Sequence, residues 1–571
     1  MNNYRAPLAY LLGITIASLC ARAECASSFN VRDYGAKGDG NTLDTTPLTK
    51  AIEACAAAGG GQVLVPPGKY LTGTVRLKSN VTILLDAGAE LIGTPDLDQY
   101  QNFTPPAGYP LVANLRWHRA MILGEGVENV TITGRGVING NNVSDAQGEE
   151  GVRGPHALLL GNCKNITLRD ISIRDAANYA VLLEFTSHVE VRGVKITGGY
   201  DGVHFRGWKD DPCRDVSITD CEFYTGDDCI AGWYWKDTLI DRCVLNSACN
   251  GIRLFGPAKN LIVHNCLFFG PGRYEWRTSG LLHHKSMAAG LCLQPSAWGP
   301  TEGAVDDVHI SDVVMHDVGT PLHMAAKSPS TIGHVTIDRL SATGVYRAAA
   351  SIESWAEQPI ARVDLRDSSI QFVGGFGPIW SQPAEAAVAF VTQQSAEVNP
   401  PGVNSRPLPA WGLYARHVTS LNLSDVRLDV VKKDARPAII LDGVDALDVD
   451  SLRWPSGMRR PMVLQSVRHI TQSGSTIPIV ETKCLSLTAS PDYKTVTATV
   501  QSGQNGLAKI ELKLDGRTIT RWAWLVADEK VDVVFVDLPQ LDRERRHEMV
   551  CGSIRAEVKA SSNWEDKGQE Q

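Results

Sequence analysis

Alternating apolar and polar positions recur along the chain at near-regular spacing. Each copy has an apolar residue, a variable one, a second apolar one and then two polar or small residues. The copies begin at Ile166, Val189, Val216, Thr238, Leu261, Val308, Val335, Val363 and Leu421. The first five begin 23, 27, 22 and 23 residues apart. This period, with Asn, Asp and Gly between copies and no helical periodicity, predicts an all-β protein built on a right-handed parallel β-helix.

In such a stack, residues at the same offset lie above one another, about 4.8 Å apart. The residues twelve positions after each start should form one column, and they are Asn178, Asp201, Asp228, Asn250 and Arg273. Offsets fourteen and sixteen suit the interior. Because side chains alternate along a strand, the residues at offsets fifteen and seventeen then point outward. The outward positions hold His204, Arg206, Ala231, Trp233, Arg253 and Phe255. A polar column beside Arg, His and Trp side chains indicates a carbohydrate-binding cleft.

Two further segments flank the repeats. Thr46-Pro47 provides an N-cap and a first-turn proline, and a helix should follow, with Leu48, Ala51, Ile52 and Cys55 on one face and its end at 59–61. This helix is expected to cover the open end of the stack. From about residue 475, strands of ordinary alternation at 496–500, 510–514, 531–535 and 554–558 predict a small β-sandwich over 475–560.

In the sandwich, Trp522 and Trp524 could bind sugar, but packing between the domains is the favoured role. Residues 561–571 have the composition of a disordered tail.

Composition and charge narrow the class of protein. The chain has 571 residues, of which 43% are hydrophobic, so it can build a large core and more than one domain. A net charge of -8 argues against a nucleic-acid partner. Arg5, the apolar run from Leu8 to Leu19 and Ala21-Arg22-Ala23 predict a signal peptide at 1–23. We therefore expect a secreted or periplasmic protein, with the β-helix domain over 24–474 and no membrane partner after cleavage.

Cysteine usage fits export without predicting a metal centre. Of 13 cysteines, Cys20 lies in the predicted signal, which leaves an even number for an oxidising compartment. Cys484 and Cys551 are alone in the C-terminal region and are the favoured mutual pair. Buried thiols stacked within the coils are the alternative for many of the others. No C-x-x-C pair or His-rich spacing occurs, so neither a metal nor another cofactor is predicted.

Two breaks in the regular spacing mark long loops. The first, 271–305, directly follows the polar column and contains Arg273, Tyr274, Trp276, Arg277, His283, His284, Lys285 and Trp298. The second, about 374–416, is rich in Pro, Gly, Ala and Gln. Long excursions from a rigid scaffold often shape binding sites, and this expectation is stronger for the first.

Several segments together carry a family resemblance. They are FNVRDYGAKGDG, GGGQVLVPPGKY, NVTILLDAGAELIG and TITGRGVING, followed by the repeats and the GDDC stretch at 226–229. Over roughly residues 28 to 470 the chain resembles the family 28 glycoside hydrolases, the polygalacturonase group of the pectin-lyase-like β-helix superfamily.

The acids fit the chemistry of glycosidic bond hydrolysis. This reaction needs one protonated carboxyl group and one ionised carboxylate, which Asp201, Asp227 and Asp228 can supply. Crowding makes full ionisation costly, so one acid should hold a proton near neutral pH or slightly below. Corner Asp residues that bind turn N–H groups are the structural alternative. The resemblance implies that Asp227 is the general acid and that Asp201 and Asp228 activate water in an inverting reaction.

The chain also departs from the family pattern. Asn250 stands where the family has His, and Cys292 and Gln294 stand at the positions of its Arg and Lys. Substitute contacts to a substrate carboxylate or sulfate could come from Arg206, Arg253 or Arg273, with Arg253 favoured. Trp233 could stack on a sugar ring, and His204 could replace the missing His.

Three functions follow from these observations. The first is an exported hydrolase of an acidic, pectin-like polysaccharide or oligosaccharide from plants or algae. The second is a polysaccharide lyase or epimerase, in which an Arg or Lys removes the proton next to a uronate carboxylate. The third is a carbohydrate-binding β-helix without turnover. The sugar, the linkage, endo or exo action and the oligomeric state are not encoded in any recognisable motif.

Overall fold

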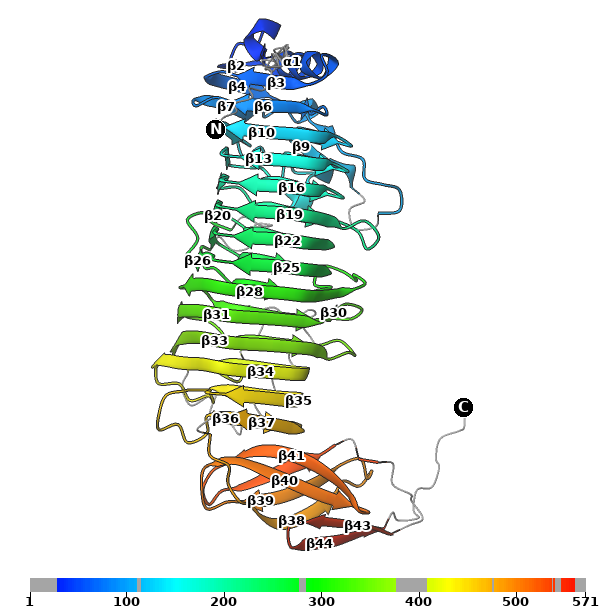
Figure 1. The fold of residues 1–571 in the computed structure, drawn as a ribbon, viewed down its shortest axis with the longest axis vertical. Coiled ribbons are helices and arrows are strands. Elements are labelled where there is room, and N and C mark those ends of the chain that lie inside the picture. Colours follow the sequence, from blue (N-terminus) through cyan, green and yellow to red (C-terminus); the bar gives the residue numbers. More distant parts are fainter. Residues whose placement is uncertain are drawn as a thin grey trace, which may run out of the picture.

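The computed structural model describes residues 28–109, 114–276, 284–375, 408–474, 477–536, 538–539 and 546–559. Its strands β1 to β37 wind into a tall stack of coils, a right-handed parallel β-helix, as predicted (Figure 1). Nearly all neighbouring strands are parallel; the β8–β9 pair is antiparallel. The predicted signal peptide, the C-terminal tail and most of the second long loop lie outside the described residues.

Three faces run the length of the stack. The repeat face is formed by β1 (Ser28–Asn30), β3 (Gly61–Val65), β6 (Val81–Leu85), β10 (Glu128–Gly134), β13 (Lys164–Arg169), β16 (Ser187–Arg192), β19 (Cys213–Thr219), β22 (Trp235–Asp241), β25 (Ala258–His264), β28 (Ala304–His316), β31 (His334–Val345), β33 (Ile360–Gly374), β34 (Leu413–Lys432), β35 (Ile439–Asp450) and β37 (His469–Ser473). The site face is formed by β5 (Val75–Arg76), β9 (Arg119–Glu125), β12 (His156–Gly161), β15 (Val181–Glu184), β18 (Val203–Arg206), β21 (Ile230–Trp233), β24 (Asn250–Leu254), β27 (Ala289–Leu293), β29 (Thr320–Ala326), β32 (Ala350–Ser354) and β36 (Met462–Gln465), together with parts of β34 and β35. The third face begins with β2 (Asp39–Leu43), β4 (Gly68–Thr72), β7 (Ala89–Gly93), β11 (Val137–Asn139), β14 (Ser172–Arg174), β17 (Lys195–Thr197), β20 (Glu222–Thr225), β23 (Val244–Ser247) and β26 (Leu267–Phe269). Two short strands lie outside these runs, β8 (Gln101–Asn102) and β30 (Thr331–Ile332).

The register of the repeat face follows the sequence pattern. Ile166 pairs with Val189, Val189 with Val216, and each later copy with the next as far as Leu421. The predicted stacking of the nine copies is therefore confirmed. Because side chains alternate along each strand, the apolar positions of every coil point into one continuous interior.

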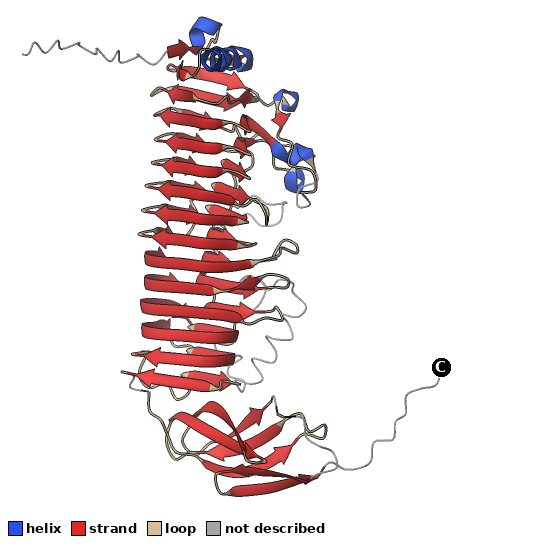
Figure 2. Cartoon of the chain, turned by 45° about the vertical axis from the view of Figure 1, so that its right-hand side comes forward, coloured by secondary structure: helices blue, strands red, loops and turns tan. Residues whose placement is uncertain are grey.

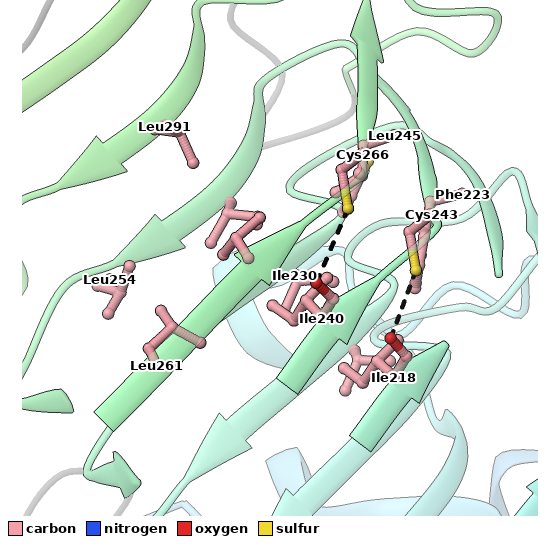
Figure 3. Packing of buried hydrophobic residues seen from close by; sticks show 14 of the residues in the cluster. Ile218, Phe223, Ile230, Ile240, Cys243, Leu245, Leu254, Leu261, Cys266 and Leu291 are labelled. Carbon is pink, nitrogen blue, oxygen red and sulfur yellow. Dashed lines mark hydrogen bonds between the residues drawn. The ribbon is translucent and has the colours of Figure 1, made fainter. Parts of the chain in front are cut away.

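Thiols line part of this interior. Cys243 and Cys266 lie in successive coils, and their sulfur atoms are hydrogen-bonded to the carbonyl oxygens of Ile218 and Ile240, at 3.5 and 3.9 Å (Figure 3). All eleven described cysteines are free thiols, ten of them buried. Cys484 and Cys551 are neighbours, but as free thiols, so the structure does not contain the disulfide predicted between them. The alternative of stacked buried thiols therefore holds for the described coils.

A helix covers the N-terminal end of the stack (Figures 1 and 2). This helix, α1 (Thr45–Ala57), buries Leu48, Ala51, Ile52 and Cys55, the four predicted residues. The predicted cap is wrong, because the N-cap residue is Asp44 rather than Thr46. The Asp44 carboxylate accepts hydrogen bonds from the N–H groups of Lys37 and Gly38, at 2.7 and 2.8 Å, so it ties the preceding loop to the helix. The other helices are short 3-10 turns, η1 (Val31–Tyr34), η2 (Leu97–Gln99), η3 (Leu115–His118) and η4 (Glu149–Gly151).

A β-sandwich covers the other end. Its two antiparallel sheets contain β38 (Lys483–Ala489), β39 (Val496–Gln501) and β42 (Lys530–Phe535), and β40 (Gly506–Leu514), β41 (Arg517–Leu525), β43 (Arg546–Cys551) and β44 (Ile554–Lys559). We propose that the division between the two parts falls at residue 474, between β37 and β38.

The sandwich and the stack share core residues. Trp524 is buried in the core of the stack, and its indole N–H donates to the carbonyl oxygen of Arg459 at 3.2 Å. The backbone N–H of Trp522 donates to the carbonyl oxygen of Val467 at 3.1 Å. The favoured packing role of both tryptophans is thus the one that the structure shows. Among the described helices, none combines the length and the apolar character that crossing a bilayer requires.

Candidate active site

The three predicted acids lie together at the turns that lead into two neighbouring strands of the site face. Asp201 precedes β18, and Asp227 and Asp228 lie between β20 and β21. Backbone hydrogen bonds link Gly202 to Asp228 and Cys229 to Asn250, so the predicted column holds from Asp201 to Asn250. The hydroxyl groups of Thr225 and Ser247 both donate to the carbonyl oxygen of Asp227, at 2.7 and 2.6 Å. The acids are therefore fixed by the coil itself.

The first and fifth predicted members of the column lie elsewhere. Because Val181 pairs with Val203, Tyr179 rather than Asn178 lies opposite Asp201. Asn250 pairs with Ala289 of β27, not with Arg273, because the loop that begins after β26 delays the next coil. Arg273 is exposed, and its guanidinium lies 3.8 Å from the ring centroid of Tyr224. Arg273 is not among the residues that line the pocket described next, so its predicted role in substrate binding is not supported.

A pocket of about 770 Å³ opens above the acids. Besides the three acids, its lining includes Glu149, Glu150, Arg153, Tyr179, His204, Arg206, Trp233, Cys249, Arg253, Phe255, Trp276 and Trp298. Four of the six predicted substrate-binding residues thus face it, namely His204, Arg206, Trp233 and Arg253. The predicted loop 271–305 is interrupted by β27, so Trp276 precedes that strand and Trp298 follows it. Arg277 and His283 lie outside the described ranges.

Each acid has its own partner. Asp201 Oδ2 lies 2.7 Å from His204 Nδ1. Asp228 Oδ1 accepts hydrogen bonds from both the backbone and the side-chain amide of Asn250, at 3.1 and 2.7 Å. Asp227 Oδ2 accepts a hydrogen bond from Arg153 Nη2 at 2.8 Å. Asn250 thus fixes a carboxylate instead of contacting the pocket directly.

Burial and mutual repulsion shift the proton affinity of the acids. Burial, followed by the charges of Asp227 and Asp228, raises the pKa of Asp201 well above its ordinary value. Burial and the charge of Asp227 raise the pKa of Asp228 to about 6, although Arg253 and Asn250 oppose the shift. A site of this kind keeps at least one proton near neutral pH, as acid catalysis requires.

His204 is a neutral, partly unsatisfied side chain in the pocket wall. Its ring stacks on Tyr179, with centroids 3.9 Å apart and planes 1° from parallel. Burial, followed by the charge of Arg206, lowers the pKa of His204 well below its ordinary value. Its Nε2 atom is buried and has no hydrogen-bond partner within the described residues. His204 can therefore offer one polar atom to a bound sugar or water.

Two arginines of the pocket, Arg206 and Arg253, differ in how many of their hydrogen-bond donors already have partners within the protein. Arg206 binds Glu149 at 3.3 Å and the hydroxyl oxygen of Tyr179 at 3.1 Å. Arg253 lies 3.7 Å from Asp228, and its Nε atom has no hydrogen-bond partner among the described residues. The guanidinium of Arg253 lies 5.5 Å from the ring centroid of Trp298, which is 62% exposed. An arginine with a spare donor beside an exposed indole suits an acidic sugar.

Sequence reasoning missed Glu149, Glu150 and Arg153. They belong to the loop between β11 and β12, residues 140–155, which has no register to place them. The spacing of the coils carried one signal of this loop. The paired residues Val130 and Ile166 are 36 residues apart, whereas the first five predicted copies begin 22 to 27 residues apart, so this coil is unusually long. The extra length belongs largely to this loop.

Within the described part of the chain, one group of side chains has the spacing of a metal site. Ligand atoms of Asp227, Asp228 and Cys249 lie within 4.8 Å of one another. Arg153 and Asn250 already bind the two carboxylates, so this donor set is committed to contacts within the protein.

Comparisons with known proteins show what the chain is similar to. Residues 28–267 match the family model described as rhamnogalacturonase A/epimerase, pectate lyase-like. A probable polygalacturonase of Vitis vinifera is 28% identical over 236 residues, 39% of this chain and 48% of that protein. An exo-poly-alpha-D-galacturonosidase of Dickeya chrysanthemi is 28% identical over 258 residues, 35% of this chain and 41% of that protein. The chain thus spans less than half the length of these two curated relatives.

A solved structure is similar at lower identity. The exopolygalacturonase of Thermotoga maritima is 18% identical, with a TM-score of 0.48 over 61% of this chain and 87% of that one. The matched family model and the curated relatives agree with the motifs and the observed fold. Over residues 28–267 the chain is therefore similar to the pectate lyase-like family of that model, and polygalacturonases are among the curated proteins that it resembles.

Proposed function

We propose that the protein hydrolyses glycosidic bonds of an acidic, pectin-like polysaccharide or oligosaccharide. The observation that carries this proposal is the convergence of three buried carboxyl groups, two with raised pKa values, in one pocket that also contains Arg253 and Trp298. Acids supply the proton and the base, the arginine suits a uronate carboxylate, and the indole suits a sugar ring. The polygalacturonase names of the relatives support the same substrate class.

The roles of the three acids follow from the resemblance and the geometry together. Asp227 donates a proton to the leaving glycosidic oxygen, and water attacks the anomeric carbon from the opposite face, which inverts its configuration. Asp228, whose pKa is raised to about 6 by burial and the charge of Asp227, takes the proton of that water. Asp201 and His204, 2.7 Å apart, orient the water and the sugar hydroxyls.

We infer that the protein acts outside the cytoplasm, because Arg5, the apolar run from Leu8 to Leu19 and Ala21-Arg22-Ala23 form a signal-peptide pattern.

Product analysis tests the function directly. Purified protein and its Asp227→Asn variant are incubated with pectic and other acidic glycans, and products are analysed by mass and by ultraviolet absorbance. We expect saturated products from the wild type and a loss of turnover of about 10³-fold or more in the folded variant. Unsaturated products would indicate a lyase instead. Binding without products across the panel would indicate a carbohydrate-binding protein. Full turnover by Asp227→Asn would contradict the assignment of Asp227 as the proton donor.

A further inference from the structure

The hydrogen bonds of Asp227 conflict with its proposed role as proton donor. Asp227 Oδ1 accepts from the N–H of Asp228 at 3.1 Å, and Oδ2 accepts from Arg153 Nη2 at 2.8 Å. Asp227 is also only 7% exposed. A hydrogen bond from a guanidinium favours the charged form of a carboxyl group, whereas a proton donor must be uncharged. The contact with Arg153 must therefore give way before catalysis, while the N–H of Asp228 is fixed in the backbone and stays.

Arg153 is the partner that can be exchanged. Its Nε donates to Glu150 at 3.2 Å, its Nη1 lies 3.9 Å from Asp201, and its guanidinium lies 4.4 Å from the ring centroid of Tyr200. It belongs to the 140–155 loop rather than to a stacked strand. Guanidinium groups bind carboxylates through two parallel hydrogen bonds, in bidentate geometry, so the carboxylate of a substrate can take the place of Asp227.

The base of the loop keeps Arg153 at the site during such an exchange. Glu149 accepts hydrogen bonds from Asn178 Nδ2 at 3.1 Å and from the hydroxyl of Tyr179 at 3.2 Å, and it pairs with Arg206. Burial opposes the ionisation of Glu149, but Arg206 and Arg153 outweigh it and lower the pKa to about 2. Glu149 therefore stays ionised and bound while the side chain of Arg153 changes partner.

We propose that Arg153 makes hydrolysis depend on an acidic sugar, because a uronate carboxylate bound beside Asp227 takes over its guanidinium and frees Asp227 to carry the catalytic proton. This inference rests on the proposed function. Once released, Asp227 takes one proton from solvent and donates it to the leaving oxygen as the glycosidic bond breaks. Water adds to the anomeric carbon and gives a proton to Asp228, which later returns it to solvent. Asp227, now ionised, binds Arg153 again when the product leaves.

Arg253 provides the matched comparison. It lines the same pocket but contacts Asp228 at 3.7 Å, so it can bind a carboxylate without changing the partners of Asp227. Loss of Arg253 should weaken substrate binding, whereas loss of Arg153 should change which substrate is turned over.

The test compares an oligogalacturonate of defined length with its fully methyl-esterified form. Both kcat and KM are measured from pH 4 to 8 for the wild type, Arg153→Gln, Arg153→Lys and Arg253→Gln. We expect the wild-type kcat to be about 100-fold higher on the acid than on the ester, and the ratio to fall below about 5-fold in Arg153→Gln. Arg153→Lys should give an intermediate ratio. Arg253→Gln should raise KM for the acid while its kcat ratio stays within about 3-fold of the wild type.

The outcomes separate this inference from the proposed function. An unchanged kcat ratio in folded Arg153→Gln, or equal wild-type turnover of acid and ester, would overturn the role of Arg153 and leave hydrolysis standing. If Arg153→Gln does not fold, the wild-type ratio and Arg153→Lys decide the question. A wild type that hydrolyses no acidic glycan at all would remove both proposals.

Discussion

Asp228 is a buried carboxyl group whose charge changes within the ordinary working range of pH. Only 3% of it is exposed, and burial with the charge of Asp227 raises its pKa to about 6. A folded-state pKa above the unfolded value of about 3.9 means that the folded protein binds this proton more tightly. The stabilisation is complete below the unfolded pKa and is lost as the pH rises through about 6. An ionised Asp228 therefore weakens the fold at neutral pH.

This cost predicts that Asp228→Asn is stabilising at high pH alone. Asn has nearly the same shape but no charge to bury, so we expect the Tm to rise by about 1–3 °C at pH 7.5 and not at pH 4.5. Turnover should fall about 10³-fold at both values. Calorimetry at the two pH values measures the stability difference. Asp220→Asn is the control, because Arg242 lowers the pKa of the exposed Asp220 carboxyl, so its loss should not stabilise the protein. An equal rise in Tm at both pH values would contradict the burial argument.

The period of the coils explains which site residues could be predicted from sequence. Asp201, Asp228 and Asn250 occupy one offset of the repeat, so counting along the chain was enough to bring them together. The same counting failed for Arg273, because a loop intervenes before the next strand. Arg153 was beyond prediction for the same reason, since a loop residue reaches the acids through contacts that have no fixed spacing in sequence.

Two close approaches of the backbone fix the path of the 140–155 loop. A Cβ atom on Gly148 would lie 1.8 Å from the carbonyl oxygen of Arg153, and one on Gly154 would lie 1.8 Å from that of Val143. The two sides of the loop can therefore approach closely only because both positions lack a side chain. This close approach sets where Glu149 and Arg153 enter the pocket.

Gly148→Ala should consequently impair activity much more than stability. The added methyl group pushes the two sides of the loop apart and moves Arg153 from the acids, while the coils beneath keep their pairing. We expect kcat/KM to fall at least about 10-fold, with a change in Tm of less than about 2 °C. Steady-state kinetics and a thermal melt measure the two effects. Gly503→Ala, at a position with nothing within 4 Å of the added carbon, should change neither. A kinetically normal Gly148→Ala variant would show that the loop does not position the site.

Helix α1 shows the limit of prediction for local structure. Its buried face was predicted because four apolar residues recur at helical spacing, and that pattern depends only on the helix itself. Its N-cap was wrong because Asp44 binds N–H groups of a neighbouring loop, a contact that helix signals do not encode.

The stack is covered at both ends, by α1 and by the sandwich (Figure 1). At the C-terminal end Trp454 packs against Trp524 with ring centroids 6.1 Å apart, and Glu529 pairs with both Arg459 and Arg460 at 2.9 Å. These covers protect the backbone groups of the first and last coils, which would otherwise pair with another chain.

A chain that ends at residue 474 should therefore associate. Without the sandwich, the last strands and the residues packed under Trp524 become exposed, so we expect dimers or larger species that grow with concentration. Light scattering after size-exclusion chromatography measures this. The same truncation should leave the pocket residues in place and retain activity in the monomeric fraction. A truncated chain that remains monomeric across concentrations would show that the sandwich does not protect this end.

The in-register pairing of the coils also governs how the protein comes apart. The backbone of each coil pairs only with the coil before and the coil after, so an interior coil cannot detach until a neighbour has gone. Under a pulling force the coils should unfold one after another from one end. Each coil of some 23 residues then releases about 80 Å of contour length. The two covers must then detach first, and the pocket, which opens on coils near the middle of the stack, is among the last structures to be lost.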